Sequence, residues 1–197
     1  MQLLIKIAKL LVPLDQRVMA TVPVLVNTFN IFHVNTQRVS SNGQPLGVAI
    51  GRYAEDVYDG GIQGGNGLGN PWFLCTAAIG EYLYRVAGEL LENGNIVVTP
   101  LNKAFYNSFL ELNLSVGTIA ITDAQFKTVI MALVGKGDAF IRRVMNHSNN
   151  GALPEQFNRD TGIPQGARDL TWSYASIITA NKARDFSVML MLKYNMV

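Results

Sequence analysis

NPWFLCTAAIGEYLYRVAGELLENG, residues 70–94, predicts the central helix around which the rest of the chain is expected to pack. Asn70 can cap a helix whose first position is Pro71, where a proline loses no hydrogen bond, and Asn93-Gly94 is a typical stop. The first turns are apolar on almost every side, so this helix has to be buried over most of its surface. Cys75 lies in the apolar run and is expected to be a small core residue.

Amphipathic helices are predicted on both sides of this stretch. Residues 126–144 carry an apolar stripe with three-and-four spacing, and either Thr122 or Asp123 can cap its start. A second stripe comes earlier in the chain. We expect its helix to begin near Thr21, because Pro23 is tolerated only in a first turn.

Two more helices are indicated. Thr99-Pro100 repeats the start signal, and an apolar helix is expected over residues 170–183. No segment shows sustained strand alternation, so the sequence predicts an all-α fold. Residues 185–197 are apolar without a readable pattern. The apolar residues of the upstream stripe are Val22, Leu25, Val26, Phe29 and Phe32, and those after Thr99-Pro100 are Leu101, Phe105 and Phe109.

Two long segments between the helices, residues 34–70 and 148–169, are rich in Gly, Asn and Pro. Loops of this length are uncommon in a compact domain and are usually functional. Each leads directly into a mostly buried helix. The pattern of outer helix, long loop and inner helix occurs twice, so we expect concentric helices with both loops at one end.

Composition excludes several classes of partner. The chain has 197 residues, of which 49% are hydrophobic and 15% charged. Its net charge of +2 is scattered, without the basic stripe of a nucleic-acid-binding surface, so no nucleic-acid partner is expected. No apolar run reaches about 18 residues, so no membrane span is expected. Residues 1–12 include Lys6 and Lys9, which favours an amphipathic helix over a signal peptide.

The sequence indicates no cofactor or metal. His33 and His147 have no cysteine or carboxylate at ligand spacing, and Cys75 has no second cysteine with which to form a disulfide. The glycine-rich residues 60–69 lack the register of a phosphate-binding loop, and we interpret them as a connector.

The first long loop holds the motif GRYAEDVY at residues 51–58, and GNPW follows at 69–72. It combines Arg52 and Asp56 with the aromatic side chains Tyr53, Tyr58 and Trp72. Saccharide sites need this combination, because rings pack against the C–H faces of a sugar while charged groups orient its hydroxyls. The alternative is an Arg52–Asp56 ion pair that only orders the loop.

The second long loop holds LPEQFNRDTG at residues 153–162, followed by ARDLTWSY at 167–174. Glu155 lies among amide and aromatic neighbours, where a carboxylate can hold and deprotonate a water molecule. The alternative is a solvated glutamate, which is the usual state of this residue type in a loop.

Together the two motifs resemble the fungal glucoamylase family, glycoside hydrolase family 15, most closely its yeast type, over residues 14–184. The resemblance implies an (α/α)6 toroid and inverting, exo-acting hydrolysis of terminal α-1,4-linked glucose from starch, glycogen or maltooligosaccharides. It implies that Glu155 is the general base. The substrate-binding residues that it implies are Arg52, Tyr53, Asp56, Tyr58, Trp72, Gln156 and Trp172.

The resemblance further implies an α-glucan as partner, a monomer, and an extracellular or vacuolar location. Three features depart from the family: the Trp-Glu-Glu motif of its general acid does not occur here, Ala54 stands where the family has proline, and residues 185–197 show no likeness. We therefore expect the C-terminal part of a glucoamylase catalytic domain, and no activity from this chain alone. The alternatives are a non-catalytic carbohydrate-binding or regulatory helical module, and an unstable fragment.

Overall fold

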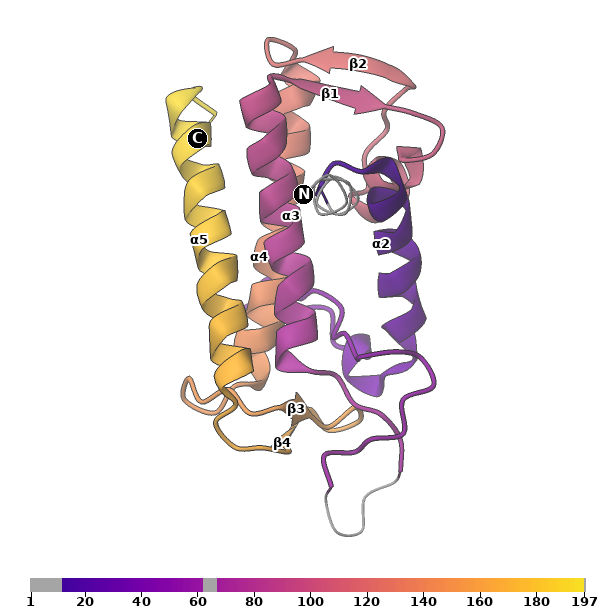
Figure 1. Ribbon diagram of the computed structural model, residues 1–197, viewed down its shortest axis with the longest axis vertical. Coiled ribbons are helices and arrows are strands. Elements are labelled where there is room, and N and C mark those ends of the chain that lie inside the picture. The colour runs from indigo at the N-terminus through magenta and orange to yellow at the C-terminus, as the bar shows by residue number, and fades with distance from the viewer. Residues whose placement is uncertain (1–11, 62–66, 197) are drawn as a thin grey trace, which may run out of the picture.

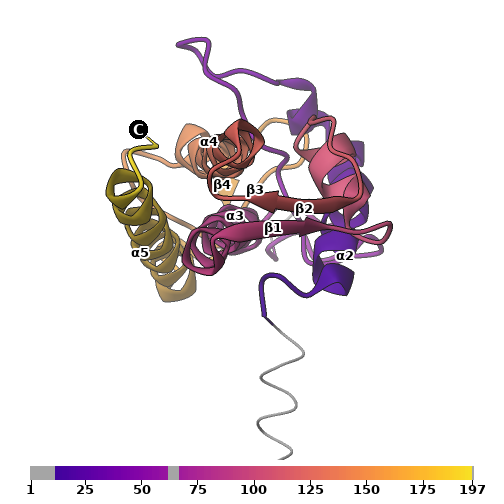
Figure 2. The same ribbon diagram turned by 90° about the horizontal axis from the view of Figure 1, so that it is seen from above.

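The computed structural model describes residues 12–61 and 67–196. Over these residues most of the fold consists of four helices: α2 (Gln16–Thr28), α3 (Phe73–Asn93), α4 (Ala124–His147) and α5 (Thr171–Lys193). Figure 1 shows α4 and α5 running alongside α3, and the end-on view of Figure 2 places α3 among α2, α4 and α5. The predicted all-α class is confirmed. The helix predicted over residues 1–12 lies outside the described residues apart from Val12.

Helix α3 is the buried helix predicted from the opening stretch. Phe73, Ala77, Leu83 and Tyr84 are inaccessible to solvent, and Cys75 packs against the same core. The helix ends where expected, at Gly94, whose φ of 68° and hydrogen bond to the Leu90 carbonyl are typical of a left-handed C-terminal cap. Its start differs from the prediction.

Trp72, and not Asn70, occupies the N-cap position of α3, and its side chain makes no capping hydrogen bond. Asn70 was predicted to cap this helix, and that prediction was wrong. Its side chain lies fully buried and bonds to two residues of the second long loop, described below.

Helix α4 confirms the predicted stripe. Asp123 caps the helix by accepting a hydrogen bond from the Gln125 amide at 2.8 Å, which decides between the two predicted caps. The stripe faces α3. The two helices can approach closely because Gly137 has no side chain: a Cβ there would lie only 2.6 Å from the Tyr84 ring. Its buried members are Phe126, Val129, Ile130, Leu133, Phe140 and Val144.

Helix α2 begins five residues before the predicted start. Asp15 caps it by accepting from the Arg17 amide, and Pro23 lies inside the helix. The local cap therefore outweighs the one hydrogen bond that the proline removes. The helix stops at Thr28, and two 3-10 turns, Phe29–Ile31 and His33–Thr36, carry the chain into the first long loop.

Two small antiparallel sheets were not predicted. Strands β1 (Asn95–Val98) and β2 (Gly117–Ala120) pair at one end of α3, and β3 (Gln156–Phe157) and β4 (Pro164–Gln165) pair at the other. Two to four residues are too few for alternation to be recognised in a sequence.

Thr99-Pro100 does not begin a long helix, contrary to the prediction. The described chain forms only one π-helical turn there, Phe105–Phe109, and Leu101 is 51% exposed instead of sharing its face. The reason is local: the Asn102 side chain accepts a hydrogen bond from the Thr99 amide at 2.7 Å, which closes a turn.

Helix α5 continues past the predicted residue 183 and includes most of the unassigned tail. It passes residue 184 without interruption and ends at Lys193, with Leu190 and Met191 buried. No helix in residues 12–61 and 67–196 combines the length and apolarity that crossing a bilayer demands.

Candidate functional site

The second long loop and residues 50–61 and 67–70 of the first lie at the end of the molecule where α3 and α5 begin (Figure 1), whereas residues 45–47 bond to the side of α4. The Val34 amide donates to the Arg159 carbonyl at 3.0 Å, so the two loops are directly bonded to each other. The site residues predicted from each loop are therefore presented on one surface.

Arg52 and Asp56 form the ion pair that was considered in the sequence. Arg52 Nε lies 2.8 Å from Oδ2 of Asp56 and Nη2 lies 2.6 Å from Oδ1, which is a bidentate geometry. The amide of Tyr58 also donates to Oδ1 at 3.0 Å. The Arg52 hydrogen bonds hold the pKa of Asp56 below its usual value, although burial opposes them. The pair orders the loop, and Arg52 keeps further N–H donors.

Aromatic rings surround this guanidinium. The Cζ atom of Arg52 lies 5.0 Å from the ring centroids of both Tyr58 and Trp72, which are themselves 6.2 Å apart. Tyr53 lies 5.5 Å from the same atom but is 53% exposed. Three of the predicted aromatic residues thus gather around Arg52.

Glu155 reaches this cluster from the second loop. Tyr58 donates its hydroxyl to Oε2 of Glu155 at 3.3 Å, across 97 residues of sequence. Burial and the Glu155 carboxylate together raise the pKa of Tyr58. The Ala167 amide donates to the same oxygen at 3.4 Å. The chain approaches Glu155 closely at Gly166, where a Cβ would lie only 2.6 Å from Oε2. Glycine has no Cβ, and it also tolerates the φ of 79° found there.

Gln156, which follows Glu155, and Trp72 each carry a buried side-chain donor. Gln156 is fully buried and accepts a hydrogen bond from Asn70 at 3.1 Å, while the two backbones of Trp72 and Gln156 form a β-bridge. Gln156 Nε2 and Trp72 Nε1 are buried without a partner among the described residues. Both nitrogens are inaccessible to solvent, so they lie beneath the surface of the cluster.

Asn70 and Arg159 were not predicted as part of this site. The Asn70 side chain donates a hydrogen bond to Gln156 and accepts one from the Arg159 amide at 3.0 Å, so it joins these two residues. Arg159 Nη1 in turn donates to the Gly69 carbonyl. The sequence signal was ambiguous, because an asparagine before a proline has the same appearance as a helix cap.

Trp172 is the predicted site residue that the structure does not join to the others. It lies in the first turn of α5 and is 66% exposed. Among the described residues, the hydrogen bonds and ring contacts that connect Arg52, Tyr58, Trp72 and Glu155 do not include it.

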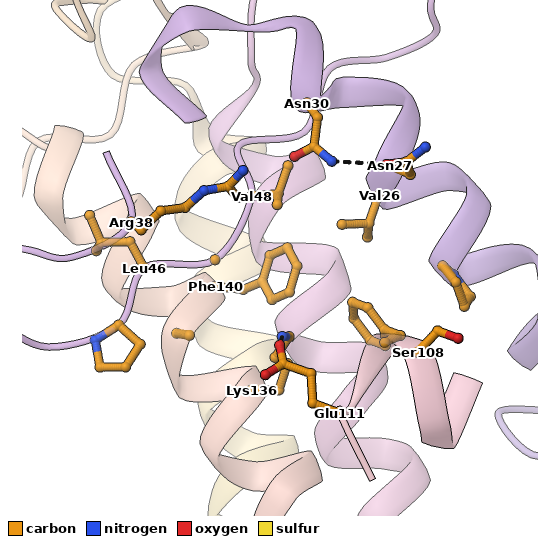
Figure 3. Close-up of a pocket in the computed structure, with 15 residues that line it drawn as sticks. Val26, Asn27, Asn30, Arg38, Leu46, Val48, Ser108, Glu111, Lys136 and Phe140 are labelled. Atoms are coloured by element: carbon orange, nitrogen blue, oxygen red, sulfur yellow. Dashed lines mark hydrogen bonds and ion pairs between the residues drawn. The ribbon is translucent and has the colours of Figure 1, made fainter. Parts of the chain in front are cut away.

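A separate groove of about 510 Å³ lies between α2, α4 and residues 45–48. Figure 3 shows the Phe140 ring at its centre, with Arg38 and Leu46 to the left of the ring and Lys136 and Glu111 below it. None of the predicted site residues lines it.

The chain has extensive similarity to known proteins. The model of the family described as glycosyl hydrolases family 15 matches residues 7–182. A glucoamylase of Blastobotrys adeninivorans is 40% identical over 174 residues, and glucoamylase 1 of Rhizopus oryzae is 35% identical; each match covers 87% of this chain. The chain spans only 27% and 28% of those two proteins.

Solved structures agree with these sequence matches. The family 15 glucoamylase of Hypocrea jecorina superposes with a TM-score of 0.75 at 35% identity, covering 88% of this chain and 27% of that one. The Saccharomycopsis fibuligera glucoamylase gives a TM-score of 0.74 at 32% identity and covers 88% of this chain and 36% of its own. The resemblance to the (α/α)6 proteins is therefore confirmed in both sequence and fold, and the chain belongs to glycosyl hydrolase family 15.

Proposed function

We propose that this chain forms the general-base side of a glucoamylase active site, which hydrolyses terminal α-1,4-glucosidic bonds of α-glucans with inversion. The observation that carries the proposal is the convergence of Glu155, Tyr58, Trp72 and the Arg52–Asp56 pair, from two loops, onto one surface. It agrees with the relatives' description as glucoamylases.

In this proposal Glu155 accepts a proton from the water that attacks the anomeric carbon. Tyr58 and the Ala167 amide both bond to Oε2, so they orient the carboxylate. An inverting glycosidase leaves room for that water by placing a second, protonated carboxyl roughly 6.5–9.5 Å away. That acid protonates the departing oxygen, and the Trp-Glu-Glu motif expected to carry it does not occur in these 197 residues.

The remaining residues would hold the terminal sugar. Arg52, whose position the bidentate bond to Asp56 determines, would direct its other N–H groups at sugar hydroxyls. The rings of Tyr58 and Trp72 would pack against the apolar face of the pyranose. We place Tyr53 and Trp172, both largely exposed, at the rim.

A chimera tests this function. The matched segment of the Blastobotrys adeninivorans glucoamylase is replaced by this chain, and glucose release from maltotriose is measured. We expect activity, and a loss of about 100-fold or more in Glu155→Gln, because general-base catalysis contributes that much. Glu111→Gln is the matched control, since Glu111 lies in the separate groove. Full activity of Glu155→Gln would contradict the assignment of the base.

The isolated chain provides a second test. Calorimetry with maltose distinguishes the proposed active-site part from a non-catalytic carbohydrate-binding module. Binding by the isolated chain together with an inactive chimera would favour the module.

We also propose that the protein acts on α-glucans as a monomer. Light scattering at increasing protein concentration measures its oligomeric state.

A further inference from the structure

Arg143, on the penultimate turn of α4, is a buried cation with unusual partners. It is inaccessible to solvent, and within the described part of the chain no carboxylate pairs with it. Burial lowers the pKa of Arg143 to about 10, so the guanidinium stays charged at neutral pH. An uncompensated buried charge is destabilising, and an apolar side chain of similar volume is often tolerated better. Core packing alone therefore does not explain this arginine.

The partners of Arg143 are backbone carbonyls of the first long loop. Nε donates to Gly47 at 2.6 Å and Nη1 donates to Val34 at 3.1 Å, while Nη2 bonds to the Gln37 carbonyl. The loop also presses against α4 directly: the Gly47 amide donates to the Ala139 carbonyl. One side chain thus determines the path of the loop just before the Arg52 motif.

His147, one turn later, faces the second long loop. Its ring stacks on Phe157 with centroids 4.3 Å apart and an interplanar angle of 11°. Nδ1 lies 3.1 Å from the Gly162 carbonyl, and Nε2 lies 3.5 Å from Nη1 of Arg143. A carbonyl only accepts and an arginine only donates, so Nδ1 carries the proton and the ring is neutral.

The contact with Gly162 is close. A Cβ at Gly162 would lie 2.6 Å from the His147 ring, and its φ of 75° also favours glycine. Phe157 lies two residues after Glu155, donates its amide to the Pro71 carbonyl at 3.1 Å and packs edge-on against Phe73 at 5.0 Å. His147 therefore contacts strand β3 and the turn that leads to β4, in the hairpin that follows Glu155.

We propose that Arg143 and His147 are positioning residues, which hold the Glu155 hairpin and the Arg52 loop in register from the end of α4. They contact no reacting atom and act through the backbone carbonyls of the two loops and the Phe157 ring. The proposal rests on the proposed function for its effect on catalysis, whereas its structural part is independent of any substrate.

The structural part is tested by hydrogen exchange on the 197-residue chain. His147→Phe keeps an aromatic ring against Phe157 and removes both polar contacts. We expect amides of residues 153–168 to exchange about tenfold faster, because one hydrogen bond to a buried group is worth about 1.4 kcal/mol. Exchange within α3 should stay unchanged. His33→Phe, at an exposed histidine, is the matched control.

Arg143→Lys is the second variant, because lysine keeps the charge and loses the fork that reaches three carbonyls. It should accelerate exchange in residues 34–50 as well as in the hairpin. Arg17→Lys, at an arginine of α2 whose native side chain bonds to Asp15 outside both loops, is its control. Unchanged exchange in both loops, or equal acceleration in α3, would overturn the proposal, since the pair would then only fill the core.

In the chimera, His147→Phe should lower kcat about tenfold and change KM less than twofold, because a misplaced base impairs the transition state more than substrate binding. An increase in KM as large as the decrease in kcat would contradict a positioning role. The two proposals fail differently: if the chimera is inactive or Glu155→Gln has no effect, the function is wrong, while the exchange experiment still decides the role of the pair.

Discussion

The two ends of α3 are built differently. At its C-terminal end, Gly94 closes the helix with a left-handed cap, as local rules predict, and the β1–β2 sheet follows. At its N-terminal end no side chain caps the helix, and the polar groups of Asn70 and Gln156 bond across the two loops instead. The C-terminal end of α3 is closed by hydrogen bonds within its own segment. The polar groups at the N-terminal end bond to a segment more than eighty residues away. This difference indicates that the second end is organised for a site.

Lowering the pH should first destabilise the N-terminal end of α3, where the two long loops meet. Burial and the neighbouring Arg143 lower the pKa of His147 from 6.5 to about 4, so the unfolded chain binds this proton more readily than the folded one. The stability that neutral His147 provides is complete above about pH 6.5 and is lost as the pH falls toward 4. The loss amounts to about 3 kcal/mol at about 1.4 kcal/mol per pKa unit.

Urea unfolding between pH 4 and 7 measures this effect. The difference between the wild type and His147→Phe isolates the histidine, because every other titrating group is common to both. A variant whose stability falls with acid as steeply as the wild type would show that His147 is not responsible.

Replacing Asn70 should affect stability and function together. Asn70→Ala removes the acceptor of the Arg159 amide and the donor to Gln156, in a buried position. We expect the free energy of unfolding to fall by about 2 kcal/mol, since buried polar groups lose their partners. In the chimera, glucose release should fall as well. Thermal unfolding and the maltotriose assay check both, and a change in stability alone would weaken the contrast between the two ends.

Replacing Gly94 should affect stability only. Alanine at a φ of 68° is strained, so Gly94→Ala should lower the free energy of unfolding by about 1 kcal/mol. Maltose affinity and chimera activity should match those of the wild type, because this end is remote from Glu155. Impaired activity at full folding would mean that the two ends are coupled through α3.

The smallest effect is expected at Trp172. Its side chain is exposed in the first turn of α5, so Trp172→Ala should change the free energy of unfolding by less than about 0.5 kcal/mol. If Trp172 lines the rim of the sugar site, maltose affinity should fall while stability stays constant. Calorimetry alongside chemical unfolding separates the two quantities. Unchanged affinity would remove Trp172 from the proposed site.

Local rules predicted the elements whose signals are self-contained. The stripe of α4, a cap at Thr122 or Asp123 and the Gly94 stop all follow from neighbours within one or two turns. The predictions were wrong where one residue is compatible with two local structures. Pro23 was taken as evidence for a helix start, and Asn70 was taken as a cap, although Asp15 and the distant Gln156 decide those positions.

The helical class, the two long loops and a set of residues suited to binding a sugar and activating water could all be predicted from local sequence patterns. The contact of Tyr58 with Glu155 across 97 residues, the bonds of Asn70 between the loops and the separate position of Trp172 became known from the packed structure alone. The difference lies in the range of the interactions. Periodicity and caps report energies within a few residues, whereas the contacts of the site depend on how α3, α4 and α5 pack together.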